Sequence, residues 1–165
     1  MAPNGTLDNT VMGGAGLNVF LAQCRALGFT RRPDGEYVIA GTDITGPSFC
    51  SGSARATNGA AGWVFNRPFG NSAQFTAVAS STDNRTFIVG FGGGSMDKFA
   101  SIDRVTVAGT ADPAWNGGAP LRFEDPATPD GFIYQFKAVT TDALGRVIIG
   151  GNKNNAGMTL IRLWP

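Results

Sequence analysis

Three segments of the chain share one arrangement of apolar and polar positions. Each starts with a short apolar run, passes through a turn that contains Asp, Asn or Gly, and ends in a β-branched run that closes on glycine. Short apolar runs on either side of such a turn are typical of antiparallel β-hairpins. The sequence therefore predicts hairpins over residues 26–41, 75–90 and 136–150, which close on Gly41, Gly90 and Gly150.

A second element also occurs three times. An Asp or Asn follows a small or apolar residue, a further apolar residue stands three positions later, and a glycine comes soon after. We expect the polar side chain to cap a tight turn and the apolar side chain to fill the space between neighbouring units. The expected turn residues are Asp8, Asn66 and Asp112, and the expected plug residues are Val11, Phe69 and Trp115.

The spacing of these two elements indicates a repeat. From the hairpin glycine to the next turn residue there are 25 positions in the first case (41 to 66) and 22 in the second (90 to 112). If the C-terminus is joined to the N-terminus, the third case, from Gly150 to Asp8, is 23 positions. We therefore expect residues 1–165 to form one domain of three repeats that is cut within a repeat. Leu7, Leu163 and Trp164 are expected at the junction where the ends of two chains complete one sheet.

Two segments resemble the halves of a bacterial repeat. Arg32–Gly41 is similar to the hairpin half of the delta-60 repeat and Asn4–Val11 to its second half, while Leu160–Leu163 matches its Ala-Arg-Leu part. The second repeat departs from the family at 84–85, where Asn-Arg replaces Asp-Gly. Proteins of this family are expected to form β-propellers, and the resemblance implies no known catalytic residues.

The repeat length points to one propeller blade. A repeat of about 50 residues supplies four strands, and a blade buries its two apolar faces only against neighbouring blades. Closed propellers have about 4–8 blades, so the three four-stranded repeats of this chain do not close a ring alone. We expect an all-β fold in which two chains meet head to tail in a six-bladed ring; the alternative is a fragment of a longer propeller.

The composition agrees with short strands joined by tight turns, because 24 of the 165 residues are Gly and only 15% are charged. The net charge of +1 and the lack of a long basic run give no indication of nucleic-acid binding. No run of 18 apolar residues predicts a membrane span. The polar N-terminal residues show no leader pattern, which leaves the compartment open between the cytoplasm and an exported protein that has lost its leader.

The residue types also limit the chemistry. The sequence has no histidine and two cysteines, which excludes Ser-His-Asp and Cys-His catalysis, His-ligated metals and a Cys-rich metal site. We therefore expect no metal and no cofactor. Cys24 and Cys50 are expected on strands that are not neighbours, as two separate thiols. The Gly-rich residues 91–96 lack the ending of a P-loop and are expected to form a flexible turn. Three turn carboxylates are expected to cap hairpins rather than bind calcium: Asp34, Asp83 and Asp142.

Loops on a rigid scaffold are the usual place for partners to bind. The insert 121–131 contains Pro126, Pro129 and Gly131 and is expected to be a surface loop. The candidate ligand-binding residues on the rim loops are Asp130, Asn152, Asn154 and Asn155. The three tryptophans either stack on sugars or fill the space between blades: Trp63, Trp115 and Trp164.

Three functions follow from these observations. The first is a non-catalytic scaffold for protein–protein interaction or assembly, with itself as the first partner. The second is a lectin-like binder of carbohydrate. The third is a hydrolase that uses a pair of carboxylates, as glycoside hydrolysis requires, drawn from Asp8, Glu36, Asp103, Asp112 and Glu124.

Overall fold

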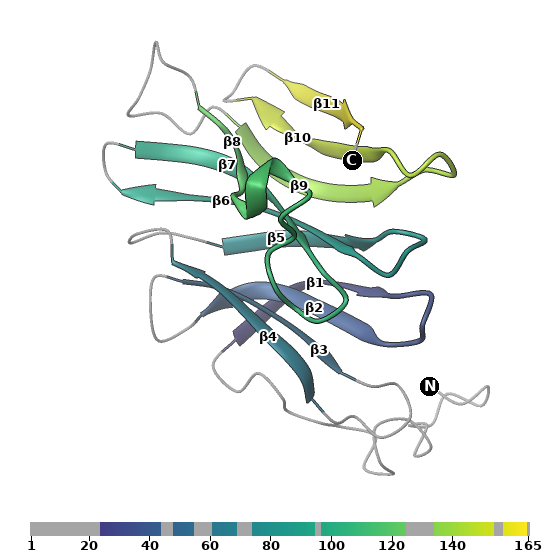
Figure 1. Ribbon diagram of the computed structural model, residues 1–165. Helices are drawn as coiled ribbons and strands as arrows, with labels where there is room; N and C mark the ends of the chain where they lie inside the picture. Colours follow the sequence, from purple (N-terminus) through teal and green to yellow (C-terminus); the bar gives the residue numbers. More distant parts are fainter. Residues whose placement is uncertain are drawn as a thin grey trace, which may run out of the picture.

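The structure, a computed structural model, describes residues 24–43, 48–54, 61–68, 74–94, 97–124, 134–153 and 157–164 (Figure 1). These residues form three antiparallel sheets, which we name A, B and C in chain order. Sheet A contains β1 (Cys24–Arg31), β2 (Tyr37–Asp43), β3 (Ser48–Ala54) and β4 (Ala61–Pro68). Sheet B contains β5 (Gln74–Ser80), β6 (Thr86–Gly94), β7 (Asp97–Val105) and β8 (Leu121–Phe123). Sheet C contains β9 (Tyr134–Thr141), β10 (Val147–Lys153) and β11 (Met158–Leu163).

The prediction of an all-β chain is confirmed, since the described residues contain no α-helix and one short 3-10 helix, η2 (Asn116–Gly118). Within each sheet the strands lie side by side in chain order. Cys24 and Cys50 belong to β1 and β3, which β2 separates, as the repeat predicted. Among the described residues, no helix has the length and apolar character needed to cross a membrane.

The three predicted hairpins are present as β1–β2, β5–β6 and β9–β10. In each turn the first residue donates its N–H to the carbonyl oxygen of the residue four positions later. The fourth turn residue has a positive φ, 92° at Gly35, 63° at Asn84 and 76° at Gly145. Glycine and asparagine adopt this left-handed conformation most readily. Asn84 therefore takes, in the second turn, the position that Gly35 and Gly145 occupy in the other two.

A second glycine position is set by a β-bulge at the start of each sheet. The pairing between the first and second strands shifts beside Gly41, Gly90 and Gly151. A Cβ atom at these positions would lie 1.9, 2.2 and 2.3 Å from a backbone carbonyl oxygen of the first strand. The sequence repeat assigned this position to Gly150, and the structure corrects it to Gly151, because only the residue at the bulge meets the neighbouring backbone.

The sheets stack face to face, from A at the bottom of Figure 1 through B to C at the top. One core cluster lies between A and B and includes Val38, Phe75 and Ile88. A second cluster lies between B and C and includes Phe87 and Ile149. Sheet B is thus buried on both of its faces, whereas A and C are each covered on one face within the described residues.

The three sheets have the same orientation in the stack. The turn register makes Val38, Phe87 and Ile148 equivalent positions on the second strand of each sheet. Val38 points from A toward B and Phe87 points from B toward C. We name this side the forward face and the opposite side the backward face. Ile149 points from C back toward B, so Ile148 belongs to a forward face that points away from the stack.

Three sequence expectations about loops were wrong. Residues 121–123 of the predicted surface loop form β8, which pairs with β7 and gives sheet B its fourth strand. Phe91–Gly94, predicted as a flexible turn, continue β6 in register with β7. Asn66, predicted in a tight turn, lies in β4 and pairs with Cys50. In each case pairing with a neighbouring strand outweighs the local turn preference of Gly, Pro or Asn.

Candidate functional site

The hairpin turns of all three sheets lie at one end of the stack, on the right in Figure 1. Each turn carries an aspartate that accepts backbone N–H groups and binds an arginine: Asp34 with Arg32, Asp83 with Arg85, and Asp142 with Arg146. The aspartates therefore cap their turns, as predicted. Among the described residues there is no group of three or more His, Cys, Asp and Glu side chains that could hold a metal ion.

The surroundings of two turn aspartates favour their ionised form. Burial raises the pKa of Asp83, but the hydrogen bond from the Ser81 hydroxyl, together with the N–H and guanidinium of Arg85, lowers that pKa below its ordinary value. The hydrogen bond from Arg146 lowers the pKa of Asp142, and the N–H groups of Leu144 and Arg146 add to this effect. Both carboxylates thus remain charged at neutral pH, which strengthens the turns.

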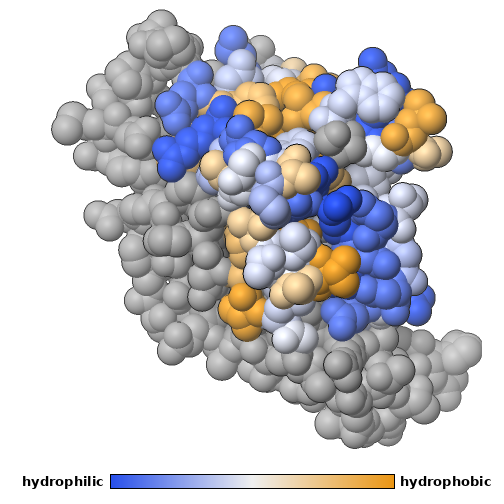
Figure 2. Space-filling model, viewed as in Figure 1, coloured by the Kyte–Doolittle hydropathy of each residue, from blue (hydrophilic) through white to orange (hydrophobic). Residues whose placement is uncertain are grey.

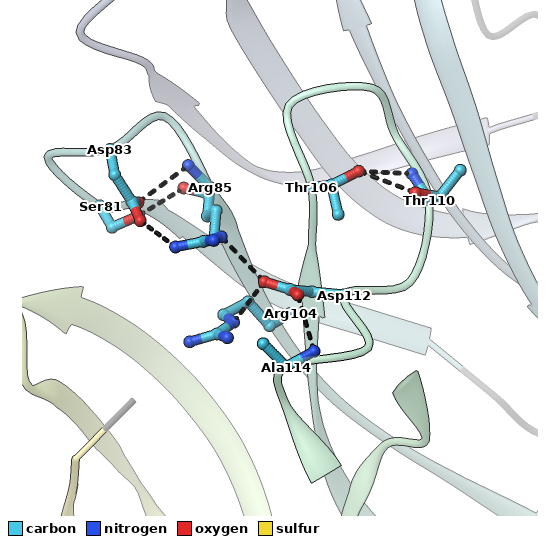
Figure 3. A network of polar contacts seen from close by, with 8 residues as sticks. All are labelled: Ser81, Asp83, Arg85, Arg104, Thr106, Thr110, Asp112 and Ala114. Atoms are coloured by element: carbon cyan, nitrogen blue, oxygen red, sulfur yellow. Dashed lines mark hydrogen bonds and ion pairs between the residues drawn. The ribbon is translucent and has the colours of Figure 1, made fainter. Parts of the chain in front are cut away.

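Asp112 is the centre of a polar network behind the turn of sheet B (Figure 3). One of its carboxylate oxygens lies 2.9 Å from Nε of Arg85 and 2.8 Å from Nε of Arg104. The other accepts the N–H of Ala114 at 3.0 Å, which caps the turn after β7. Asp112 is 3% exposed, so the two guanidinium groups supply the countercharge that a buried carboxylate needs. We call this arrangement the Arg-Asp-Arg clamp.

Aromatic side chains enclose the clamp on the side of sheet C. The guanidinium of Arg104 lies 5.3 Å from the ring centre of Trp115 and 6.0 Å from that of Phe87. Trp115 is buried and meets Phe87 edge to face in the cluster between B and C. The structure therefore places Trp115 between two sheets, where the sequence had assigned a plug residue.

A pocket of about 400 Å³ opens beside the clamp and is lined by Ser81, Arg85, Phe87 and Arg104 of sheet B and by Gly145 of the sheet C turn. A second pocket of about 370 Å³ lies between the turns of sheets A and B. Because Asp83 and Asp112 balance the two arginines, the first pocket has no excess charge and would suit a small polar, uncharged group.

The other candidate residues are spread over the molecule. Asn152 is exposed at the end of β10. Leu163 packs into the cluster between B and C, and its place at a junction between chains stays a prediction. Trp164 is 68% exposed beside Arg146, and Trp63 packs against the core between A and B. Several candidates lie outside the residues that the structure describes: Leu7, Asp8, Val11, Phe69, Asp130, Asn154 and Asn155.

Four of the five carboxylates considered for hydrolysis lie among the described residues, and Asp8 lies outside them. Asp112 is held in the clamp, Glu36 lies 3.5 Å from the guanidinium of Arg32, and Glu124 lies 3.8 Å from that of Arg122. Asp103 is buried in β7. The ion pairs of Asp112, Glu36 and Glu124 stabilise turns and a strand end.

The outer faces of the stack carry exposed apolar side chains. On the forward face of sheet C, Met158 and Leu160 are 96% and 76% exposed, and Figure 2 shows hydrophobic surface over β10 and β11. On the backward face of sheet A, Phe29 and Val64 are 74% and 52% exposed. Exposed apolar patches of this kind commonly mark interaction surfaces.

No protein-family profile matches the chain, and no curated protein matches it in sequence. The class that the structure defines is an all-β chain of stacked antiparallel sheets.

Proposed function

We propose that the chain is a non-catalytic β-propeller scaffold that assembles head to tail with a second copy. In this assembly the forward face of sheet C packs on the backward face of the partner's sheet A. The observation that carries this proposal is the common orientation of the three sheets. Among the described residues, each contact between sheets joins a forward face to a backward face, and the forward face of sheet C and the backward face of sheet A are not covered by another described sheet.

The forward face of sheet C has the composition of a buried face. Leu160 occupies the position of Ile102 in sheet B, since each pairs with the equivalent residue of the second strand. Ile102 is 0% exposed because sheet C covers it, whereas Leu160 is 76% exposed. Met158 stands likewise at the position of the fully buried Ala100. A further sheet would remove this apolar surface from water, which is the main driving force of association.

The backward face of sheet A is the matching surface. Phe29 pairs with Ile39, and the equivalent pair in sheet B is Val78 with Ile88, which is buried against sheet A. Val78 is 7% exposed, against 74% for Phe29. A phenylalanine at a position where sheet B carries a buried valine gives this face more apolar area to cover.

Two chains joined in this way would contribute six sheets, within the range of about 4–8 blades found in closed propellers. A head-to-tail contact forms a closed ring only when its rotation per chain divides a full turn. The ring would align the hairpin turns of six sheets on one end and present the polar pockets between them as the surface for further partners.

The proposal is tested by sedimentation velocity on single-residue variants of the two outer faces. Leu160→Arg and Phe29→Arg should each shift the chain toward monomer, because an arginine would be buried without a partner in the contact. Val107→Arg is the matched control, since Val107 is 49% exposed on a turn of the middle sheet. Unchanged circular dichroism would show that the variants fold. Assembly of both face variants at wild-type affinity would contradict the proposal.

A further inference from the structure

The pocket beside the Arg-Asp-Arg clamp is built by one chain. The hairpin turn of sheet B contributes Asp83 and Arg85, β7 contributes Arg104, and two further turns contribute Ala114 and Gly145. Its volume of about 400 Å³ falls within the range of about 300–1,000 Å³ that is usual for small-molecule sites. The pocket therefore has the size of a ligand site and does not depend on the assembly proposed above.

The pocket contains hydrogen-bond donors that no described residue uses. Arg104 is 7% exposed, and its Nε lies 2.8 Å from the carboxylate of Asp112. Within the described part of the chain, its two terminal amino groups have no hydrogen-bond acceptor, and Figure 3 shows that they point away from Asp112. Buried donors without an acceptor are costly. These amino groups therefore favour a ligand that accepts hydrogen bonds.

The same pocket also offers an acceptor. The carboxylate of Asp83 accepts a hydrogen bond from the Ser81 hydroxyl and binds the guanidinium of Arg85. The side chain of Asp83 is 49% exposed, so lone pairs of its carboxylate remain open to a ligand. Its lowered pKa keeps it ionised at neutral pH. A ligand that fits this pocket thus both donates and accepts hydrogen bonds.

The charges of the pocket favour an uncharged ligand. Asp83 and Asp112 balance Arg85 and Arg104, so a bound anion would face both aspartates and a bound cation both arginines. A hydroxyl group is one donor and two acceptors, and neighbouring hydroxyl groups can donate to Asp83 while they accept from Arg104. A lone carboxamide also combines a donor and an acceptor, but its few atoms would leave most of the pocket empty.

We propose that this pocket binds a sugar ring through neighbouring hydroxyl groups, with Arg104 as the donor and Asp83 as the acceptor. The site goes beyond the scaffold function and gives the chain a carbohydrate ligand. It lies on the end of the stack that carries the hairpin turns, where loops are commonly used for binding.

The pocket between the turns of sheets A and B is an internal comparison. Its buried arginine, Arg32, is 2% exposed. One terminal nitrogen donates to the carbonyl oxygen of Val107 at 3.2 Å, and the other binds Asp34. The buried donors of this pocket are already used by the turn and the neighbouring sheet. We therefore expect the sugar in the pocket between B and C.

The test is a titration of the ¹⁵N-labelled chain, followed by two-dimensional NMR, with the methyl glycosides of glucose, mannose and galactose. Acetamide and sodium acetate are titrated separately. At least one glycoside should shift the amide signals of Ala114 and Gly145. The dissociation constant should be on the order of 1–10 mM, as expected of a ligand with about a dozen heavy atoms.

Two variants and a matched control locate the site. Ala114→Phe should abolish binding, because Ala114 lines the pocket and is exposed, so a phenylalanine there would fill the space of the sugar. Ala108→Phe makes the same change at an exposed turn residue of sheet B outside the lining and should bind as the unmodified chain does. Arg104→Lys keeps the charge beside Asp112 but has one terminal amino group, and its dissociation constant should rise at least tenfold. Circular dichroism checks that each variant folds.

The outcomes are distinct. Binding that Ala114→Phe abolishes and Ala108→Phe preserves would support the site. Binding that persists in Ala114→Phe would place the sugar elsewhere and overturn it, and so would the absence of shifts at glycoside concentrations well above the expected dissociation constant. Shifts at Ala114 and Gly145 with acetamide or acetate but with no glycoside would overturn the ligand class. None of these results depends on a second copy of the chain, so they are independent of the test of assembly.

Discussion

Two adjacent glycines of β10 should respond oppositely to the same substitution. At Gly151 an added Cβ would lie 2.3 Å from the carbonyl oxygen of Gln135 and 3.0 Å from the Cα of Phe136. Ordinary contact begins at 3.4 Å, so β9 would have to move by about 1 Å at the bulge. This movement would break one or two backbone hydrogen bonds, each worth about 1 kcal/mol, and would add strain. We therefore expect Gly151→Ala to lower the free energy of unfolding by roughly 2–4 kcal/mol.

Gly150→Ala is the internal control for this prediction. Its added Cβ would meet only the Cβ of Ala138 at 3.9 Å, and the equivalent positions in sheets A and B already carry Ala40 and Val89. The smaller conformational freedom of alanine in the unfolded chain should leave stability unchanged or raise it by about 0.5 kcal/mol. Guanidinium denaturation followed by tryptophan fluorescence, at fixed protein concentration, measures both free energies of unfolding. If Gly150→Ala costs as much as Gly151→Ala, the assigned register of sheet C is wrong.

Three further predictions concern the polar network and the turns. Asp112→Asn should cost about 3 kcal/mol in denaturant unfolding, because it leaves Arg104 buried without its countercharge; a cost below 1 kcal/mol would contradict the clamp. Asn84→Ala should cost about 1–2 kcal/mol, since alanine tolerates the positive φ poorly and the hydrogen bond to the turn of sheet A is lost, whereas Asn84→Gly should cost less. The folded-state pKa of Asp142 is lowered, so its ionised form stabilises the chain above the ordinary carboxyl pKa near 4, and this contribution disappears as the pH falls through the lower folded-state value. Asp142→Asn should therefore be less stable than the unmodified chain at pH 7, and this difference should shrink as the pH falls below about 4; a difference that does not change with pH would refute the role of Arg146.

The sequence predicted the features that depend on local chemistry. The hairpins were found because a turn residue with positive φ favours Gly or Asn, which gives the signals at Gly35, Asn84 and Gly145. The closing glycine of the third hairpin was assigned one residue too early, because Gly150 and Gly151 are adjacent in the sequence and only the pairing with β9 tells them apart.

Features that join distant segments were missed. The clamp connects a turn, a strand and a second turn, at Arg85, Arg104 and Asp112, and no short motif contains all three. The missed signal was the recurrence of arginine at the residue that closes the turn and in the third strand, at Arg146 and Arg162. The loop 121–123 was misread because its strand pairing is provided by β7, more than fifteen residues earlier.

The central claim is that the sheets of one chain continue, in the same orientation, into those of another. The molar mass of the unmodified chain, measured by multi-angle light scattering across a dilution series, tests it most directly. We expect a species of twice the chain mass of 17.1 kDa that dissociates on dilution. A folded species of 17.1 kDa at every concentration would contradict it.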